Sequence, residues 1–215
     1  AGISEISPRR LKQTFEAEVA DRTPRDSFYH CLKNSAHQFH NKQEEDHYIL
    51  AGYPWFKCRA RDMFVSLPGL TLAVDEIGEF EDVMETARKA INNYIKGEPI
   101  GCKIYEMDDP DVLLWAVWAL QQYAKETSRE QCRAKYGSLL EEIIDFIRQR
   151  KHDNLFLHEN GLLYANGADR AITWMNSTVN GRPVIPRTGY IVEINALWYN
   201  ALRFIADLVR EGGNG

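Results

Sequence analysis

Five tryptophans, with the carboxylates and arginines near them, are the residues of this chain best suited to chemistry. They are Trp55, Trp115, Trp118, Trp174 and Trp198. Trp55 precedes Arg61 and Asp62, and Trp198 follows Glu193. Sugar rings present apolar C–H faces beside hydroxyl groups, so sugar sites combine aromatic platforms with Asp, Glu and Arg. The pattern favours carbohydrate, although any single tryptophan is more simply a core residue.

Glycoside hydrolysis needs two carboxyl groups flanking the bond, one acting as acid and the other as base or nucleophile. Six carboxylates lie at the ends of segments, namely Asp62, Asp108, Asp109, Asp111, Glu159 and Glu193. Each alone is more simply a helix cap or a surface charge. Position by itself therefore leaves the choice of a catalytic pair open.

Composition and motifs exclude several other classes. The 215 residues carry 26 basic and 31 acidic side chains, and this net charge of −5 argues against a surface that binds nucleic-acid phosphates. No apolar run approaches the roughly 20 residues of a transmembrane helix. There is neither a Gly-rich phosphate loop nor a G-x-S-x-G motif. The four cysteines are isolated and the histidines lack metal-ligand spacing, so we expect no metal and no cofactor.

The periodicity of apolar residues predicts a mostly helical chain of about seven helices. The helices expected from stripes and start signals cover residues 8–20, about 24–39, 80–95, 110–120, 139–147 and 197–209. Ser7-Pro8, Thr23-Pro24 and Asp109-Pro110 are the expected start signals.

Two segments break the helical pattern. Residues 47–60 read as an extended stretch followed by a turn at Gly52 and Pro54. Residues 153–193 contain several Asn-Gly dipeptides and prolines, which mark turns. The short apolar runs 155–157 and 162–164 could pair as strands. A loop of this length in a compact domain is often functional.

These residues also fall into blocks whose order resembles the glycogen debranching enzymes, specifically their amylo-α-1,6-glucosidase domain. The blocks are Ala51-Gly52-Tyr53-Pro54-Trp55-Phe56, Arg61-Asp62, Leu67-Pro68-Gly69-Leu70, Asp111-Val112-Leu113-Leu114-Trp115, Thr173-Trp174-Met175, Pro186-Arg187-x-Gly189, and the run from Val192 to Tyr199. Together they span residues 51 to 202.

The resemblance implies an (α/α)₆ toroid, related to the glucoamylase fold, whose loops form a sugar pocket at one end. It implies hydrolysis of the α-1,6-linked glucose at branch points of glycogen-like α-glucans, with inversion and without a metal. By position, Asp111 matches the general acid and Glu193 the general base. Arg61 and Asp62 match residues that hold the terminal glucose, and the remaining pocket residues are Trp55, Trp115, Trp174, Arg187 and Trp198.

The sequence also departs from this family. Arg59-Ala60 stands where the family usually has Trp-Gly before its Arg-Asp pair, and Asn176 replaces an aspartate after Thr-Trp-Met. Twelve helices need a longer chain, because a helix with its connection uses about 20–30 residues. We therefore expect residues 1–215 to be one helical domain that forms about half of a larger ring. A half ring would expose apolar helix faces, which favours a homodimer.

An inverting mechanism requires the two carboxyl groups to lie about 6.5–9.5 Å apart, with a water between base and sugar. A helix N-terminus stabilises an aspartate as the anion, whereas a general acid must be protonated. Burial beside Trp115 and the charge of Glu193 would have to outweigh this effect for Asp111. Otherwise the two roles are reversed, or Asp111 is only a cap.

Three interpretations stay open at this point. The first is a debranching-type glycoside hydrolase, or another (α/α)₆ glycosidase acting on a different glucoside. The second is a non-catalytic carbohydrate-binding piece of such an enzyme. The third is a helical interaction module that shares only ancestry with the family. Because the sequence begins without a basic and apolar leader, we expect a cytoplasmic protein.

Overall fold

The computed structural model describes residues 6–52 and 55–212. Tyr53 and Pro54, which belong to the Ala51–Phe56 block and to the expected turn, lie outside the described residues. The chain separates into two compact units, residues 1–38 and residues 39–215. We call them the N-terminal unit and the main unit.

The N-terminal unit contains two helices, α1 (Pro8–Asp21) and α2 (Phe28–His37). The Ser7-Pro8 signal is confirmed, because the Ser7 side chain accepts a hydrogen bond from the Arg10 backbone N–H at 3.4 Å. The expected start at Thr23-Pro24 is wrong. The second helix begins four residues later, where the Ser27 hydroxyl accepts from the His30 N–H at 3.1 Å and satisfies an otherwise unpaired donor.

The main unit is built on five α-helices among its described residues. They are α3 (Ala60–Leu70), α4 (Ile77–Lys96), α5 (Val112–Glu126), α6 (Arg129–Arg148) and α7 (Val192–Gly212), with a short 3₁₀ turn η1 at Leu72–Val74. The Asp109-Pro110 signal is correct to within two residues, since α5 begins at Val112 with Asp111 in the N-cap position. With α1 and α2 the described chain has seven α-helices, which matches the expected number of about seven, although residue ranges were assigned to only six of them.

The sequence pattern did not single out α3. Its residues include Pro68 and Gly69, which normally indicate a turn, yet the helix continues through Pro68 to Leu70. Burial explains this result, because Met63, Phe64 and Leu67 are completely buried. The packing of this apolar face holds the segment helical despite the proline.

Every strand in the described residues belongs to a two-stranded pair. β1 (His40–Gln43) pairs with β2 (Asp46–Ile49), which confirms the extended run before Gly52. The parallel pair of β3 (Cys58–Arg59) and β4 (Ile104–Tyr105) joins the segments that precede α3 and α5.

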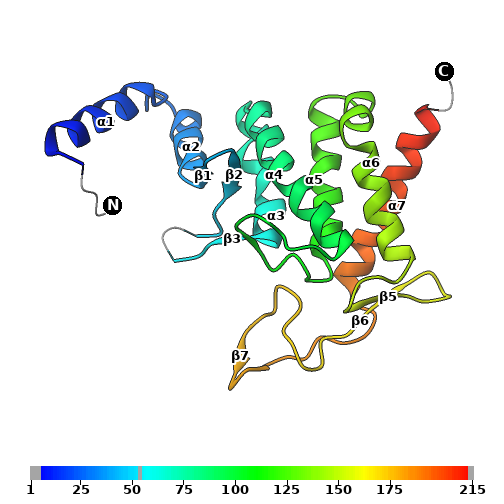
Figure 1. Ribbon diagram of the computed structural model, residues 1–215. Coiled ribbons are helices and arrows are strands. Elements are labelled where there is room, and N and C mark those ends of the chain that lie inside the picture. The colour runs from blue at the N-terminus through cyan, green and yellow to red at the C-terminus, as the bar shows by residue number, and fades with distance from the viewer. Residues whose placement is uncertain (1–5, 53–54, 213–215) are drawn as a thin grey trace. The chain divides into compact units, whose positions relative to one another are not determined.

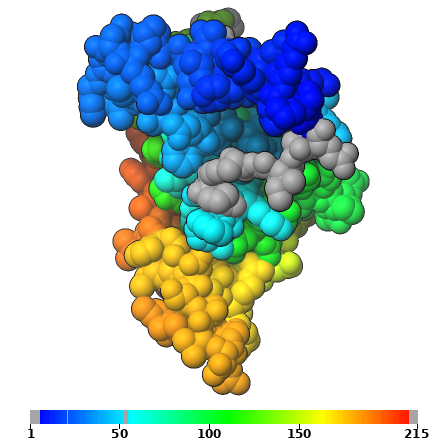
Figure 2. All heavy atoms as spheres, turned by 90° about the vertical axis from the view of Figure 1, so that its left-hand side faces the viewer, coloured from blue at the N-terminus to red at the C-terminus, as the bar shows by residue number. Residues whose placement is uncertain are grey.

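The long segment before α7 contains two antiparallel hairpins. β5 (Leu155–Leu157) pairs with β6 (Leu163–Ala165), so the expected strand pair is confirmed with the second strand shifted by one residue. β7 (Thr178–Val179) and β8 (Arg182–Pro183) are joined by Asn180 and Gly181, both with positive φ. This is the turn that an Asn-Gly dipeptide favours. Figure 2 shows the atoms of this segment, in yellow and orange, gathered in one lobe.

The core of the main unit centres on α5, which packs against α3, α6 and α7. Most of its side chains are buried, so the continuous apolar run from Val112 to Leu120 is the signature of a helix surrounded by others. The fold is therefore all-α and is consistent with part of an (α/α)₆ toroid. None of the described helices combines the length and the apolar character that a bilayer-spanning helix needs.

Candidate functional site

The residues expected to form the site come from the N-terminal ends of three helices. Arg61 lies in the first turn of α3, Asp111 occupies the N-cap position of α5 without a side-chain capping bond, and Glu193 lies in the first turn of α7. In Figure 1 these helix starts lie at the same end of the main unit, beside the loop that carries β5 to β8. The fold therefore places at one end of the main unit three helix starts that the sequence separates by up to 132 positions, from residue 61 to residue 193.

The first group of side chains surrounds Arg61 and is buried. The Arg61 guanidinium donates to both oxygens of Asp111, each at 2.8 Å, and to Asp109 at 2.7 Å. Its Nη2 also donates to the Ile172 carbonyl at 3.3 Å. The indole N–H of Trp115 reaches Asp111 at 3.2 Å. Asp111 is thus a buried carboxylate whose two oxygens are already hydrogen-bonded. We call Arg61, Asp109, Asp111 and Trp115 the buried cluster.

Asp109 differs from its neighbour Asp111. Burial raises the pKa of Asp109 to about 6, although the cations of Arg61 and Arg170 act in the opposite direction. Asp109 also lines a polar cavity of 310 Å³, whereas Asp111 does not. The other lining residues are Arg59, Glu106, Asp108, Asp169, Arg170, Ala171, Asn176, Thr178 and Gly181. Asp109 is therefore a carboxyl that can hold a proton near neutral pH at the wall of a cavity.

The second group surrounds Glu193, and we call it the half-exposed cluster. Arg187 bonds both oxygens of Glu193, at 3.1 Å for Oε2 and more closely for Oε1. The indole N–H of Trp174 donates to Oε1 at 3.1 Å. Burial alone would raise the pKa of Glu193, but the hydrogen bonds from Arg187, its own backbone N–H and Trp174 lower it below its usual range. Glu193 is therefore held as an anion while 34% of its side chain stays exposed.

One short piece of loop connects the two clusters. The Ile172 carbonyl accepts from Arg61 in the buried cluster, and Trp174, two residues later, donates to Glu193 in the other. Two residues of extended chain span at most about 7 Å. Thr173, between these two residues, is 1% exposed, so the segment is buried at this point. The segment from Ile172 to Trp174 therefore contacts one residue of each cluster.

Backbone and amide contacts hold this loop against α7. The Asn195 side chain bonds both the N–H and the carbonyl of Leu163, at 2.8 and 3.0 Å. Ala165 and Gly189 exchange two backbone hydrogen bonds of 2.9 Å. Gly167 sits so close that a Cβ there would lie 2.4 Å from the Arg187 carbonyl. Arg187 is therefore positioned by close backbone packing that only glycine at 167 allows.

The structure places the other expected pocket residues in different surroundings. Trp174 and Trp55 are exposed, and Trp115 is half-buried with its ring edge-on to Trp118 at 5.4 Å. Trp198 is 4% exposed, and its indole N–H donates to the Gly161 carbonyl at 3.2 Å. In this position Trp198 supports the β5–β6 turn and offers little ring surface to a ligand. Asp62 is exposed in the first turn of α3.

Sequence reasoning did not single out Arg170. Its guanidinium bonds Asp108 and, at 3.2 Å, Asp109, so it is the second cation of the polar cavity. Arg170 lies in the long loop among turn residues, where no helix or strand period marks it. Among the described residues, no three His, Cys, Asp or Glu side chains group closely enough to hold a metal ion.

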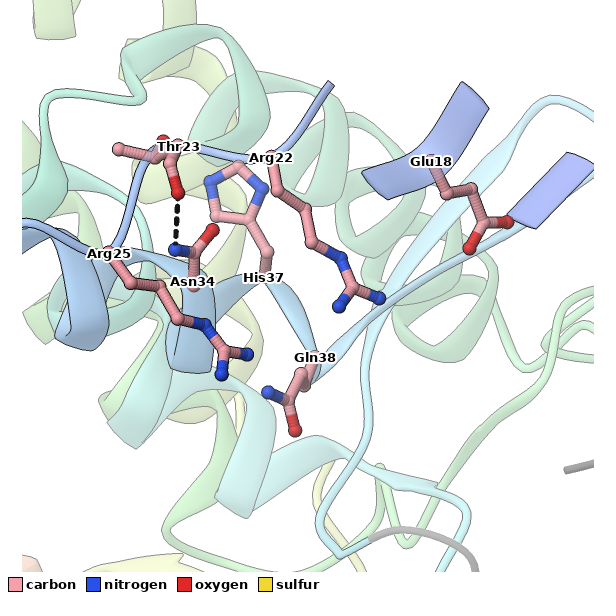
Figure 3. A pocket seen from close by; sticks show the side chains of 7 residues that line it. All are labelled: Glu18, Arg22, Thr23, Arg25, Asn34, His37 and Gln38. Atoms are coloured by element: carbon pink, nitrogen blue, oxygen red, sulfur yellow. Dashed lines mark hydrogen bonds between the residues drawn. The ribbon is translucent and has the colours of Figure 1, made fainter. Parts of the chain in front are cut away.

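A separate pocket of 250 Å³ lies within the N-terminal unit (Figure 3). It is lined by Glu18, Arg22, Thr23, Arg25, Asn34, His37 and Gln38. Figure 3 shows the Asn34 amide bonded to the Thr23 carbonyl, a contact of 2.8 Å. None of the residues singled out for glycosidase chemistry lines this pocket.

Most of the chain, including the residues of both clusters, matches a known family. Residues 32–213 match the family described as amylo-alpha-1,6-glucosidase. The chain belongs to the amylo-alpha-1,6-glucosidase family. The match includes α3 to α7 and the loop between α6 and α7, so it contains both clusters, whereas α1 lies outside it. Comparison with curated proteins and with solved structures gives no match.

Proposed function

We propose that this protein is a glycoside hydrolase of the debranching type. It releases the α-1,6-linked glucose at branch points of a glycogen-like α-glucan by an inverting acid–base mechanism. The observation that carries the proposal is the state of Glu193, an accessible carboxylate kept anionic by Arg187 and Trp174 in a chain of this family. A cytoplasmic setting is part of the same proposal.

Glu193 is proposed as the general base. A base that activates water must be deprotonated at working pH and reachable by that water. The lowered pKa of Glu193 meets the first condition, and its exposed fraction of 34% meets the second. The first turn of α7 adds the positive end of a helix dipole, which also favours the anion.

The general acid is proposed from the buried cluster. Asp111 matches the position of the family acid, but the Arg61 guanidinium already donates hydrogen bonds to both its oxygens. To donate a proton, Asp111 must first lose part of this bonding when the sugar binds. Asp109 already has a pKa of about 6 and faces the polar cavity. Asp111 and Asp109 are therefore both candidates for the general acid, and their asparagine variants distinguish them.

Sugar recognition is proposed for the exposed aromatic and charged groups around the clusters. The exposed Trp174 ring can stack on the apolar face of a glucose while its N–H stays on Glu193. Asp62, Trp55 and Trp115 are proposed to line the same sugar pocket. Arg61 and Arg187 are proposed for it as well. Trp198 is proposed to act from behind, by fixing the β5–β6 turn.

A second candidate function is glycan binding without turnover. The observation that favours it is the hydrogen bonding of Asp111, because both of its oxygens are already bonded to Arg61 or Trp115 and neither is left for a glycosidic oxygen. Asn176, which replaces an acidic residue and lines the polar cavity, points in the same direction. In that case the tryptophans would still bind α-glucan, but no glucose would be released.

The test is release of glucose from a branched limit dextrin by the chain and by Glu193→Gln, Asp111→Asn and Asp109→Asn. Loss of Glu193 should lower the rate by about 10²–10⁴-fold, the usual contribution of a general acid or base. Glu159→Gln changes an exposed loop carboxylate and serves as the matched control. Tryptophan fluorescence on titration with maltooligosaccharides separates a binder from a protein without glycan affinity. Full activity of Glu193→Gln would overturn the proposed mechanism.

A further inference from the structure

Helix α1 carries an apolar stripe that lies open to solvent. Leu11, Phe15 and Val19 recur every four residues and are 47%, 62% and 46% exposed. Residues at this spacing lie on one face of a helix. The other side chains from residue 8 to residue 20 are also exposed. The helix therefore has an apolar face like those that pack in a core, without a covering layer.

A helix of this kind needs a partner. α1 has 14 residues, and isolated helices shorter than about 12–15 residues are marginal in water. Tertiary packing of an apolar face supplies most of the stability of such helices. The 62% exposure of Phe15 shows where that packing is missing.

The charges on α1 identify what the partner must offer. Arg9, Arg10 and Lys12 lie in its N-terminal half, and Glu16 and Glu18 lie in its C-terminal half. A helix dipole favours the opposite arrangement, with acidic groups first and basic groups last. The first turn of α1 has no acidic residue and its last turn no basic one. Its charges thus oppose its own dipole, and an antiparallel helix with the same charge order would compensate both.

We propose that α1 pairs with α1 of a second copy of this chain, antiparallel and centred on Phe15. In this register the residues at equal distance from Phe15 face each other. Leu11 then packs on Val19 of the other copy, four residues to each side. Lys12 lies opposite Glu18, three residues to each side, so charges of opposite sign meet. A parallel pair would instead bring like charges together.

This surface is independent of the glycosidase site. α1 precedes the family match, which begins at residue 32. A helix of 14 residues is about 21 Å long, so the pair buries less area than a permanent dimer does. We therefore expect a reversible, concentration-dependent dimer that does not need the proposed catalytic function.

The first experiment is sedimentation velocity of the whole chain over a range of concentrations. Wild type should shift from monomer to dimer, and Phe15→Asp should weaken association at least about 100-fold because both copies lose the contact. Val209→Asp is the matched control, since Val209 is 61% exposed on α7. It should leave the dimer unchanged, and a loss of dimer in this variant would instead assign association to α7.

The second experiment tests the antiparallel register by exchanging the charges. The five-fold variant Arg9→Glu, Arg10→Glu, Lys12→Glu, Glu16→Lys and Glu18→Lys reverses the charge order and keeps the sequence self-complementary. It should dimerise with itself as well as wild type does, but should not mix with wild type. Mixing of the two would indicate a parallel pair and contradict the proposal.

Amide hydrogen exchange of residues 8–21 keeps the test decisive, because it reports whether α1 is helical in each variant. A wild-type chain that stays monomeric with α1 helical would overturn the proposal. So would a Phe15→Asp chain that dimerises with unchanged affinity. The glucose-release assay is measured in parallel, and its outcome does not affect this result.

Discussion

The buried and half-exposed clusters use the same parts in different surroundings. In each, an arginine bonds both oxygens of a carboxylate, and a tryptophan indole donates a further hydrogen bond. The Asp111 side chain is only 3% exposed, whereas that of Glu193 is 34% exposed. Burial therefore decides what the shared geometry does. It encloses the Arg61–Asp111 pair between α3 and α5, and it leaves part of the Glu193 carboxylate accessible to solvent.

The largest expected difference between the clusters is in stability. Arg61→Met leaves the buried Asp111 without its cation and Asp109 with Arg170 alone, and it should lower the free energy of unfolding by about 3–5 kcal/mol. Arg187→Met breaks a partly exposed pair and should cost less than about 1 kcal/mol. Urea unfolding measures both. Adding Asp111→Asn to Arg61→Met should restore part of the loss, and equal losses in the two arginine variants would remove the distinction.

The second prediction compares the two clusters in catalysis. Asp111→Asn and Glu193→Gln should each reduce glucose release by about 10²–10⁴-fold if both carboxyl groups transfer protons. Asp109→Asn should fall in the same range only if Asp109 is the donor. Rates are compared at a substrate concentration that saturates the wild type. A drop in Asp109→Asn with Asp111→Asn unaffected would move the acid to Asp109.

The pH dependence of stability should have opposite signs in the two clusters. The pKa of Asp109 is raised to about 6, so ionising it weakens the fold as pH rises from about 4 to 6. Asp109→Asn should therefore gain stability relative to wild type over that interval. The pKa of Glu193 is lowered, so its contribution is present above the ordinary glutamate pKa and is lost in acid. Glu193→Gln should lose stability relative to wild type as pH rises, and parallel unfolding curves would contradict both assignments.

A further pH effect is expected from His152, which lies next to the start of the long loop. Burial lowers its pKa to about 4, so the folded state resists its protonation. Stability should therefore fall as pH drops below about 6.5, the value of an ordinary histidine. His152→Phe should flatten this acid limb in thermal unfolding. An unchanged limb would show that other groups cause it.

The sequence predicted helices and turns correctly where local signals agree with tertiary packing. It predicted them less well where packing overrides the local signal. Ser7-Pro8, the apolar stripes and the Asn180-Gly181 turn predicted their elements because each acts over a few residues. The start of α2 was misplaced because Thr23-Pro24 and Ser27 are both plausible caps. The helix α3 was not found because Pro68 and Gly69 conceal a stretch that burial keeps helical.

The candidate site was predictable in its residue types and not in its bonding. The resemblance to the family identified Arg61, Asp111, Arg187 and Glu193 as site residues. No sequence pattern indicates which arginine pairs with which carboxylate. The contacts of Ile172 and Trp174 with the two clusters also exist only once the long loop has folded. The raised pKa of Asp109 likewise follows from burial, which composition cannot give.

The most direct test of the proposed hydrolase is the anomeric form of the first glucose released from a branched limit dextrin. Proton NMR recorded within the first minutes distinguishes β-glucose from α-glucose before the two forms interconvert. A water activated by Glu193 on the face opposite the leaving oxygen should give β-glucose with wild type, and Glu193→Gln should release almost none. Initial α-glucose, or β-glucose from Glu193→Gln at the wild-type rate, would contradict the account.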